Sequence, residues 1–186
     1  MPPHTNRRPG PKLLRQGLRL EYATLGWNVV GTAVILAAAI SAGSVALAGF
    51  GLDSLIEIFA SIVVVRQLKR VNQSRERTAL RCIAVAFYLL AIYVACQSTY
   101  VLQAGVRPGT SAAGMAWLSA TVIAMLLLAW GKRTTGRQLD NPVLQTEARV
   151  TLIDAWLAAS VLLGVGLNAA FRWWWADPAA GLIIVY

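Results

Sequence analysis

Residues 45–65 read VALAGFGLDSLIEIFASIVVV, an apolar run in which Asp53 and Glu57 are the only charged residues. A helix rises about 1.5 Å per residue, so about 20 such residues cross the roughly 30 Å of hydrocarbon in a bilayer. The run therefore predicts a transmembrane helix that carries two acids inside it. Because an ionisable side chain in a membrane costs about 2.5 kcal/mol or more, both acids are candidates for a functional site.

The same apolar character extends along most of the chain. Of its 186 residues, 57% are hydrophobic and only 13% are charged, against about 25% charged in a soluble domain. We expect an all-α, polytopic membrane bundle of six helices, with a basic cytoplasmic tail at 1–20 and a transmembrane domain at 21–186. The expected spans are about 22–40, 45–65, 80–102, 113–130, 151–170 and 177–186, and we expect the sixth to be cut short.

The basic residues lie on alternate connections between these spans. Of the 17 lysines and arginines, all but Arg107 and Arg172 precede the first span, separate the second from the third, or separate the fourth from the fifth. An excess of Lys and Arg marks cytoplasmic connections, so we expect a cytoplasmic N-terminus and location in the plasma membrane, the inner membrane of a bacterium. The net charge of +9 is thereby explained by topology, without nucleic-acid binding. Lys132 is expected in a cytoplasmic connection, which leaves no basic side chain at the depth of the acids.

Three of the eight acidic residues lie in apolar surroundings. Asp53 and Glu57 share one helix face because they are four residues apart, and Asp154 lies early in the fifth span, which can approach the second. Like charges placed together need a counter-ion, and carboxylate oxygens suit Mg²⁺, Mn²⁺ or Zn²⁺. The three acids therefore predict a cation pathway. Asn28 and Asn168, in the first and fifth spans, either ligate an ion or hydrogen-bond between helices.

Structural roles are the alternative for each acid. Asp53 or Asp154 could cap a helix, and a protonated Glu57 could hydrogen-bond a nearby serine. Glu147 and Thr151 are further candidate ligands, since they form an i, i+4, i+7 stripe with Asp154. Glu147 would be an ordinary solvated acid if it lies at the cytoplasmic interface.

Four segments resemble the cation diffusion facilitator (cation efflux) family. Residues 43–47 (GSVAL) and 53–57 (DSLIE) are similar to its second-helix motif, 154–164 to its fifth helix, and 175–178 (WADP) to the start of its sixth. The resemblance begins near Tyr22 and covers the transmembrane domain only, without the cytoplasmic C-terminal domain of typical members.

Members of that family exchange cytoplasmic metal, commonly Zn²⁺ or Mn²⁺, for protons by alternating access, usually as homodimers. The resemblance implies the same activity and a homodimer here, with Asp53, Glu57 and Asp154 as three ligands of a central metal site. Val150 stands where the family usually offers a fourth ligand, and Glu57 stands where the family usually has a shorter ligand. Water, Thr151 or Glu147 would then complete the set.

Two other functions are weighed against a proton-coupled divalent-cation transporter. One is a non-transporting membrane sensor or interaction partner with a degenerate metal site. The other is an intramembrane aspartyl protease, because residues 49–53 (GFGLD) are superficially similar to the GxGD signature. One extra residue precedes the acid in this chain, so the register does not fit. We therefore expect no enzyme and no resident cofactor, only a transported cation and protons.

Overall fold

The apolar segments fold as helices in this computed structural model, which describes the backbone of residues 11–69, 73–140 and 142–185. The helices are α1 (Pro11–Ala42), α2 (Val45–Lys69), α3 (Gln73–Ala104), α4 (Ala112–Gln138), α5 (Pro142–Phe171) and α6 (Ala176–Val185). These ranges contain no strand, which confirms the all-α class and the six helices.

Four of the helices are long and apolar enough to cross a membrane. They comprise Arg15–Ala42, Ala84–Ala104, Ala112–Gln138 and Leu144–Phe171. Large apolar side chains point away from the bundle, among them Ile40, Tyr88 and Trp130, which are 85%, 74% and 71% exposed. Lipid, not water, is the solvent that such a surface fits. The chain is an integral membrane protein by these criteria. The sequence also predicts that α2 crosses the membrane. Part of that helix, residues 63–69, has side chains outside the described residues, so the crossing stays a prediction.

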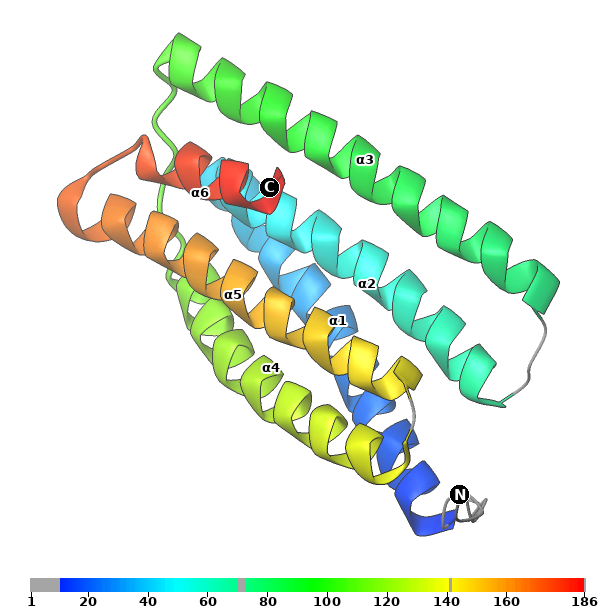
Figure 1. Ribbon diagram of the computed structural model, residues 1–186. Coiled ribbons are helices and arrows are strands. Elements are labelled where there is room, and N and C mark those ends of the chain that lie inside the picture. The colour runs from blue at the N-terminus through cyan, green and yellow to red at the C-terminus, as the bar shows by residue number, and fades with distance from the viewer. Residues whose placement is uncertain (1–10, 70–72, 141, 186) are drawn as a thin grey trace, which may run out of the picture.

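α2 lies at the centre of the bundle, antiparallel to α1, α3 and α5 and parallel to the short α6 (Figure 1). α2 contacts α1, α3, α5 and α6, while α4 packs against α1 and α5. The start of α1, the end of α2, the start of α3, the end of α4 and the start of α5 lie at one end of the bundle, and the α1–α2, α3–α4 and α5–α6 connections lie at the opposite end (Figure 1). The distribution of basic residues along the sequence predicts this same division.

Helices α1 to α5 are longer than the expected spans. α1 begins at Pro11, so residues 11–20, expected as a tail, are helical, whereas 1–10 lie outside the described residues. Proline is tolerated in the first helical turn because its missing N–H has no partner there. Ser111 caps α4 by accepting a hydrogen bond from the Gly114 amide at 3.1 Å. Hydropathy marks only the part of a helix in hydrocarbon, and these helices continue beyond it.

The short helix α6 is held tightly against α5 and α2. A Cβ added at Gly164 of α5 would lie 2.3 Å from the Ala180 Cβ and 2.8 Å from the Ala176 oxygen, so only glycine allows this approach. At the start of α6, the Asp177 carboxylate accepts a hydrogen bond from the Val45 amide at 3.1 Å. It accepts another from the Ser44 hydroxyl group. α6 thus caps α2, the helix that carries two of the predicted site residues.

Candidate metal centre

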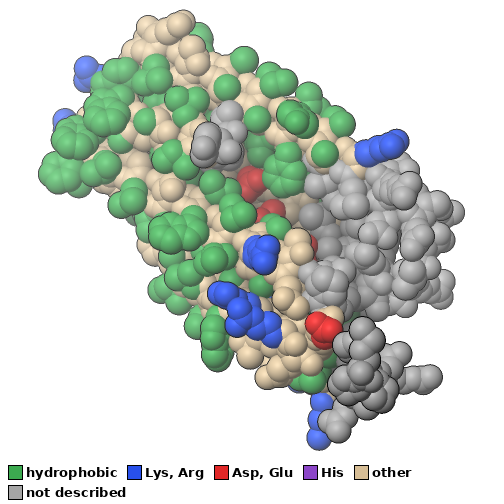
Figure 2. All heavy atoms as spheres, in the orientation of Figure 1, with side chains coloured by type: hydrophobic (Ala, Val, Ile, Leu, Met, Phe, Trp, Pro, Cys, Tyr) green, Lys and Arg blue, Asp and Glu red, His purple; other side chains and the backbone are tan. Residues whose placement is uncertain are grey.

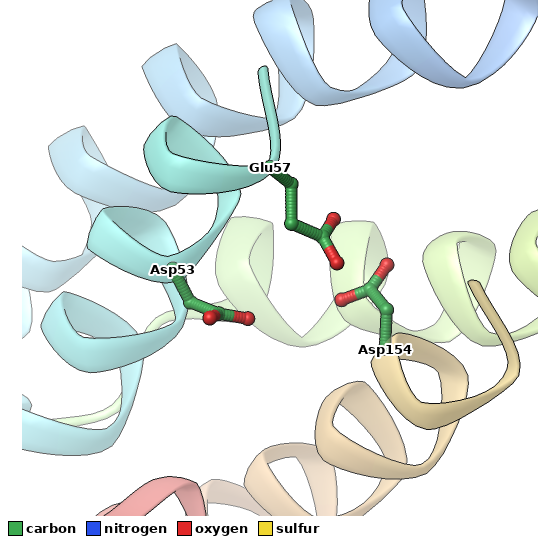
Figure 3. A group of neighbouring side chains, drawn as sticks. All are labelled: Asp53, Glu57 and Asp154. Atoms are coloured by element: carbon green, nitrogen blue, oxygen red, sulfur yellow. The ribbon is translucent and has the colours of Figure 1, made fainter. Parts of the chain in front are cut away.

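α2 and α5 bring the three predicted acids together (Figure 3). Asp53 and Glu57 lie one turn apart on α2, and Asp154 faces them from α5. One carboxylate oxygen from each residue lies within 4.8 Å of the others. Figure 3 shows the carboxylates of Glu57 and Asp154 turned toward each other, with that of Asp53 directed into the same space. The predicted approach of the fifth span to the second is therefore confirmed.

The cluster is largely withdrawn from solvent. Asp53 is 4% and Asp154 2% exposed, and Glu57 is partly buried. Acidic side chains are visible in the middle of the face seen in Figure 2, framed by hydrophobic ones. The Asp154 Oδ1 atom has no hydrogen-bond partner among the described residues. A buried, unsatisfied carboxylate oxygen is costly, so its position fits a cation or a proton supplied from outside the chain.

Asn28 joins the site from a third helix. Its Nδ2 atom donates a hydrogen bond of 2.9 Å to the Glu57 Oε2 atom, linking α1 to α2. The sequence predicts either an ion ligand or a hydrogen bond between helices for Asn28, and the structure shows the hydrogen bond. Such a contact fixes the orientation of a ligating carboxylate, as second-layer partners do in metal sites. Asn168 lies elsewhere and donates to the Pro108 carbonyl oxygen at 2.9 Å.

A buried lysine contradicts the expectation that no basic side chain lies at the depth of the acids. Lys132 is fully buried, and its Nζ atom lies 3.2 Å from the Oε2 atom of Glu21, which is fully buried as well. The Glu147 Oε2 atom lies 3.7 Å from the same nitrogen. α4 continues to Gln138, so Lys132 belongs to the helix and not to the connection. Hydropathy does not predict that Lys132 is buried while its neighbour Arg133 is exposed, because both residues are charged.

The two further candidate ligands lie with this lysine. Thr151 accepts a hydrogen bond from the Lys132 Nζ atom at 3.1 Å and donates one to the Glu147 carbonyl oxygen at 2.9 Å. Glu147 does not belong to the group of three acids. Val150 is 39% exposed and therefore points away from the interior. Four residues, Glu21, Lys132, Glu147 and Thr151, thus form a second polar group, here called the lysine cluster.

Sequence reasoning missed Glu21, although a signal was present. Glu21 immediately precedes the first expected span, and Lys132 follows the fourth by two residues. An acid and a base that flank two apolar runs at the same predicted end of the bundle can meet if the two helices pack together. α1 and α4 do pack together, which places the pair in one buried site.

The spacing of the three acids suits a single divalent cation. Metal–oxygen distances of about 2.0–2.6 Å place opposite ligands about 4–5 Å apart, and the three carboxylate oxygens, which lie within 4.8 Å of one another, are close to that spacing. Carboxylate oxygens favour hard or borderline cations over soft ones. Helices α2 and α5 supply all three carboxylates, and α1 holds one of them in place.

No family model matches the chain, and no curated protein matches its sequence. Fold and site together define an integral membrane helix bundle with a buried carboxylate cluster.

Proposed function

We propose that this protein transports divalent cations across a membrane, with Asp53, Glu57 and Asp154 as the ligands of the transported ion. The observation that carries the proposal is the convergence of three carboxylates within 4.8 Å, one of whose buried oxygens lacks a partner among the described residues. The sequence resemblance to the cation diffusion facilitator family supports the same activity. It also favours Zn²⁺ or Mn²⁺ as the cargo and a homodimer as the working form.

Protons are the natural counter-substrate of such a site. A carboxylate must lose its proton to ligate a cation, so metal and protons compete for the same oxygens. The ligands come from two helices, Asp53 and Glu57 from α2 and Asp154 from α5. A shift of one helix against the other separates Asp154 from the α2 pair and weakens binding. That division of the ligands supports alternating access coupled to protonation.

Flux measurements on the full chain in proteoliposomes test this function. Metal uptake and proton movement are recorded for Zn²⁺, Mn²⁺, Mg²⁺, Co²⁺ and Cd²⁺, using wild type, Asp53→Asn and Asp154→Asn. Asp140→Asn is the matched control, because it makes the same chemical change at an exposed acid. We expect metal-dependent proton flux in wild type and the control, and none in the two site variants. Wild-type flux in both site variants would overturn the proposal.

A non-transporting metal sensor or interaction partner is the second candidate. It is favoured by the lysine cluster, because Glu147 and Thr151, which could complete the ligand set, are already engaged by Lys132. Zn²⁺ or Mn²⁺ binding by calorimetry that depends on Asp154, together with no flux of any tested cation, would select this candidate.

A further inference from the structure

A groove of about 310 Å³ lies on the outside of the bundle, between α4 and α5. It is separate from both polar clusters described above. Six of the side chains that line it are Leu126, Trp130, Arg133, Arg137, Arg149 and Leu152.

The lining of the groove changes from charged to apolar along its length. On α4, residues 126, 130, 133 and 137 follow one another at helical spacing and share one face. Arg137 is nearest the α4–α5 connection, Arg133 lies one turn deeper, and Trp130 and Leu126 lie deeper still. α5 runs antiparallel, so Arg149 lies closer to the connection and Leu152 farther from it. The groove therefore has a basic end and an apolar end.

The arginines at the basic end have no acidic partner in the described part of the chain. All three arginines are exposed. Lys132 is the basic member of every ion pair among the described residues, so none of these pairs includes an arginine of the groove. Figure 2 shows basic side chains gathered on this face, beside hydrophobic ones. Three guanidinium groups on one groove favour an anion that carries several acceptor oxygens, such as a phosphate.

The floor of the groove is formed by tightly packed helices. Gly136 lets α5 approach so closely that an added Cβ would lie 3.0 Å from the Gln145 Cγ atom. The Gln145 Nε2 atom donates a hydrogen bond to the Gly136 carbonyl oxygen at 3.3 Å. Direct contacts between α4 and α5 thus fix the backbone at the basic end of the groove.

We propose that this groove binds an anionic phospholipid, with its phosphate at Arg133, Arg137 and Arg149 and an acyl chain along Trp130 and Leu126. The polarity of the groove follows that of a phospholipid from headgroup to chain. Free phosphate would use only the basic end and would leave Trp130, which is 71% exposed, without a function in binding. Basic pockets between transmembrane helices on the cytoplasmic side are suited to anionic headgroups, and the positive-inside pattern assigns this end to that side.

Lipid binding to the full chain, measured by native mass spectrometry from detergent, tests the proposal. Phosphatidylglycerol and phosphatidylcholine of the same chain length are titrated onto wild type and onto the groove variant R133Q/R137Q/R149Q. We expect the groove variant to bind phosphatidylglycerol at least about tenfold more weakly, because the lipid phosphate loses its three guanidinium partners in the groove. Phosphatidylcholine binding should be equal in the two proteins.

A matched control removes the same charge from the same predicted side. The variant R15Q/R19Q/R81Q replaces three exposed arginines outside the groove, and it should bind phosphatidylglycerol like wild type. Equal weakening in the control and groove variants would overturn the proposal in favour of general surface charge.

Inorganic phosphate provides the second arm, because it separates a lipid from a free anion. We expect it not to displace phosphatidylglycerol at equal concentration, and we expect Trp130→Ala to weaken lipid binding with the arginines intact. Displacement by phosphate, or an unchanged lipid affinity in Trp130→Ala, would overturn assignment to a lipid.

Discussion

Replacing Lys132 by methionine should destabilise the protein strongly. Methionine keeps the length of the side chain but removes the charge that faces Glu21 at 3.2 Å, with both side chains fully buried. Removal of one partner from a buried ion pair costs about 3–5 kcal/mol, since the remaining charge has neither solvent nor counter-ion. Glu147 retains some access to solvent, as its side chain is 15% exposed, so the loss falls mainly on Glu21. At about 2–4 °C per kcal/mol, the melting temperature should fall by roughly 6–20 °C.

Thermal unfolding in detergent, followed by circular dichroism, measures this effect. Arg133→Met is the matched control, because the neighbouring residue carries the same charge but is exposed. The double variant Lys132→Met/Glu21→Leu should recover most of the loss, since replacing a whole buried pair by apolar residues is often neutral. A melting temperature for Lys132→Met within about 2 °C of wild type would refute the buried ion pair as a source of stability.

Three further substitutions test the packing and the site. Gly164→Ala should cost about 1–3 kcal/mol through overpacking against α6, whereas Gly166→Ala, with no atom within 4 Å of the added Cβ, should be tolerated; equal melting temperatures would contradict this. Asp177→Ala should cost about 0.5–2 kcal/mol because α2 loses its cap, and an unchanged unfolding free energy would argue against that role. Asn28→Ala should weaken Zn²⁺ binding about 10–100-fold in calorimetry, because the Glu57 carboxylate loses the hydrogen bond that orients it. Asn168→Ala should leave Zn²⁺ binding unchanged, and a similar effect of both substitutions would refute the orienting role of Asn28.

The helices could be predicted because the bilayer imposes a simple rule on sequence. Backbone groups in hydrocarbon must be satisfied within the segment, so long apolar runs become helices whatever their neighbours. The helix ends were harder to predict. Residues 11–20 begin with Pro11 and carry the basic residues Lys12, Arg15 and Arg19, yet they form the first turns of α1, since a helix that leaves the membrane needs no continuous apolar run. Hydropathy carries no signal for that continuation.

The carboxylate cluster was predictable in part, whereas for the lysine cluster the sequence offers only the positions of Glu21 and Lys132 beside two apolar runs. The four-residue spacing of Asp53 and Glu57 follows from helix geometry, and the approach of Asp154 follows from the scarcity of acids in apolar segments. Lys132, by contrast, is followed by the exposed Arg133 in a basic stretch. Which of two adjacent basic residues turns inward depends on the packing of α4 against α1 and α5. That packing is a tertiary property, and sequence spacing alone does not determine it.

The lysine cluster also bears on what must neutralise the carboxylates. Lys132 supplies one positive charge and already lies beside two acids, Glu21 and Glu147. Its single positive charge is shared with these two acids, so it cannot balance the three carboxylates Asp53, Glu57 and Asp154 as well. Those carboxylates still need compensation, because several unpaired charges in a low-dielectric interior are not stable. A divalent cation or bound protons would supply it, and exchange between the two is the chemistry that the proposed proton-coupled transport requires.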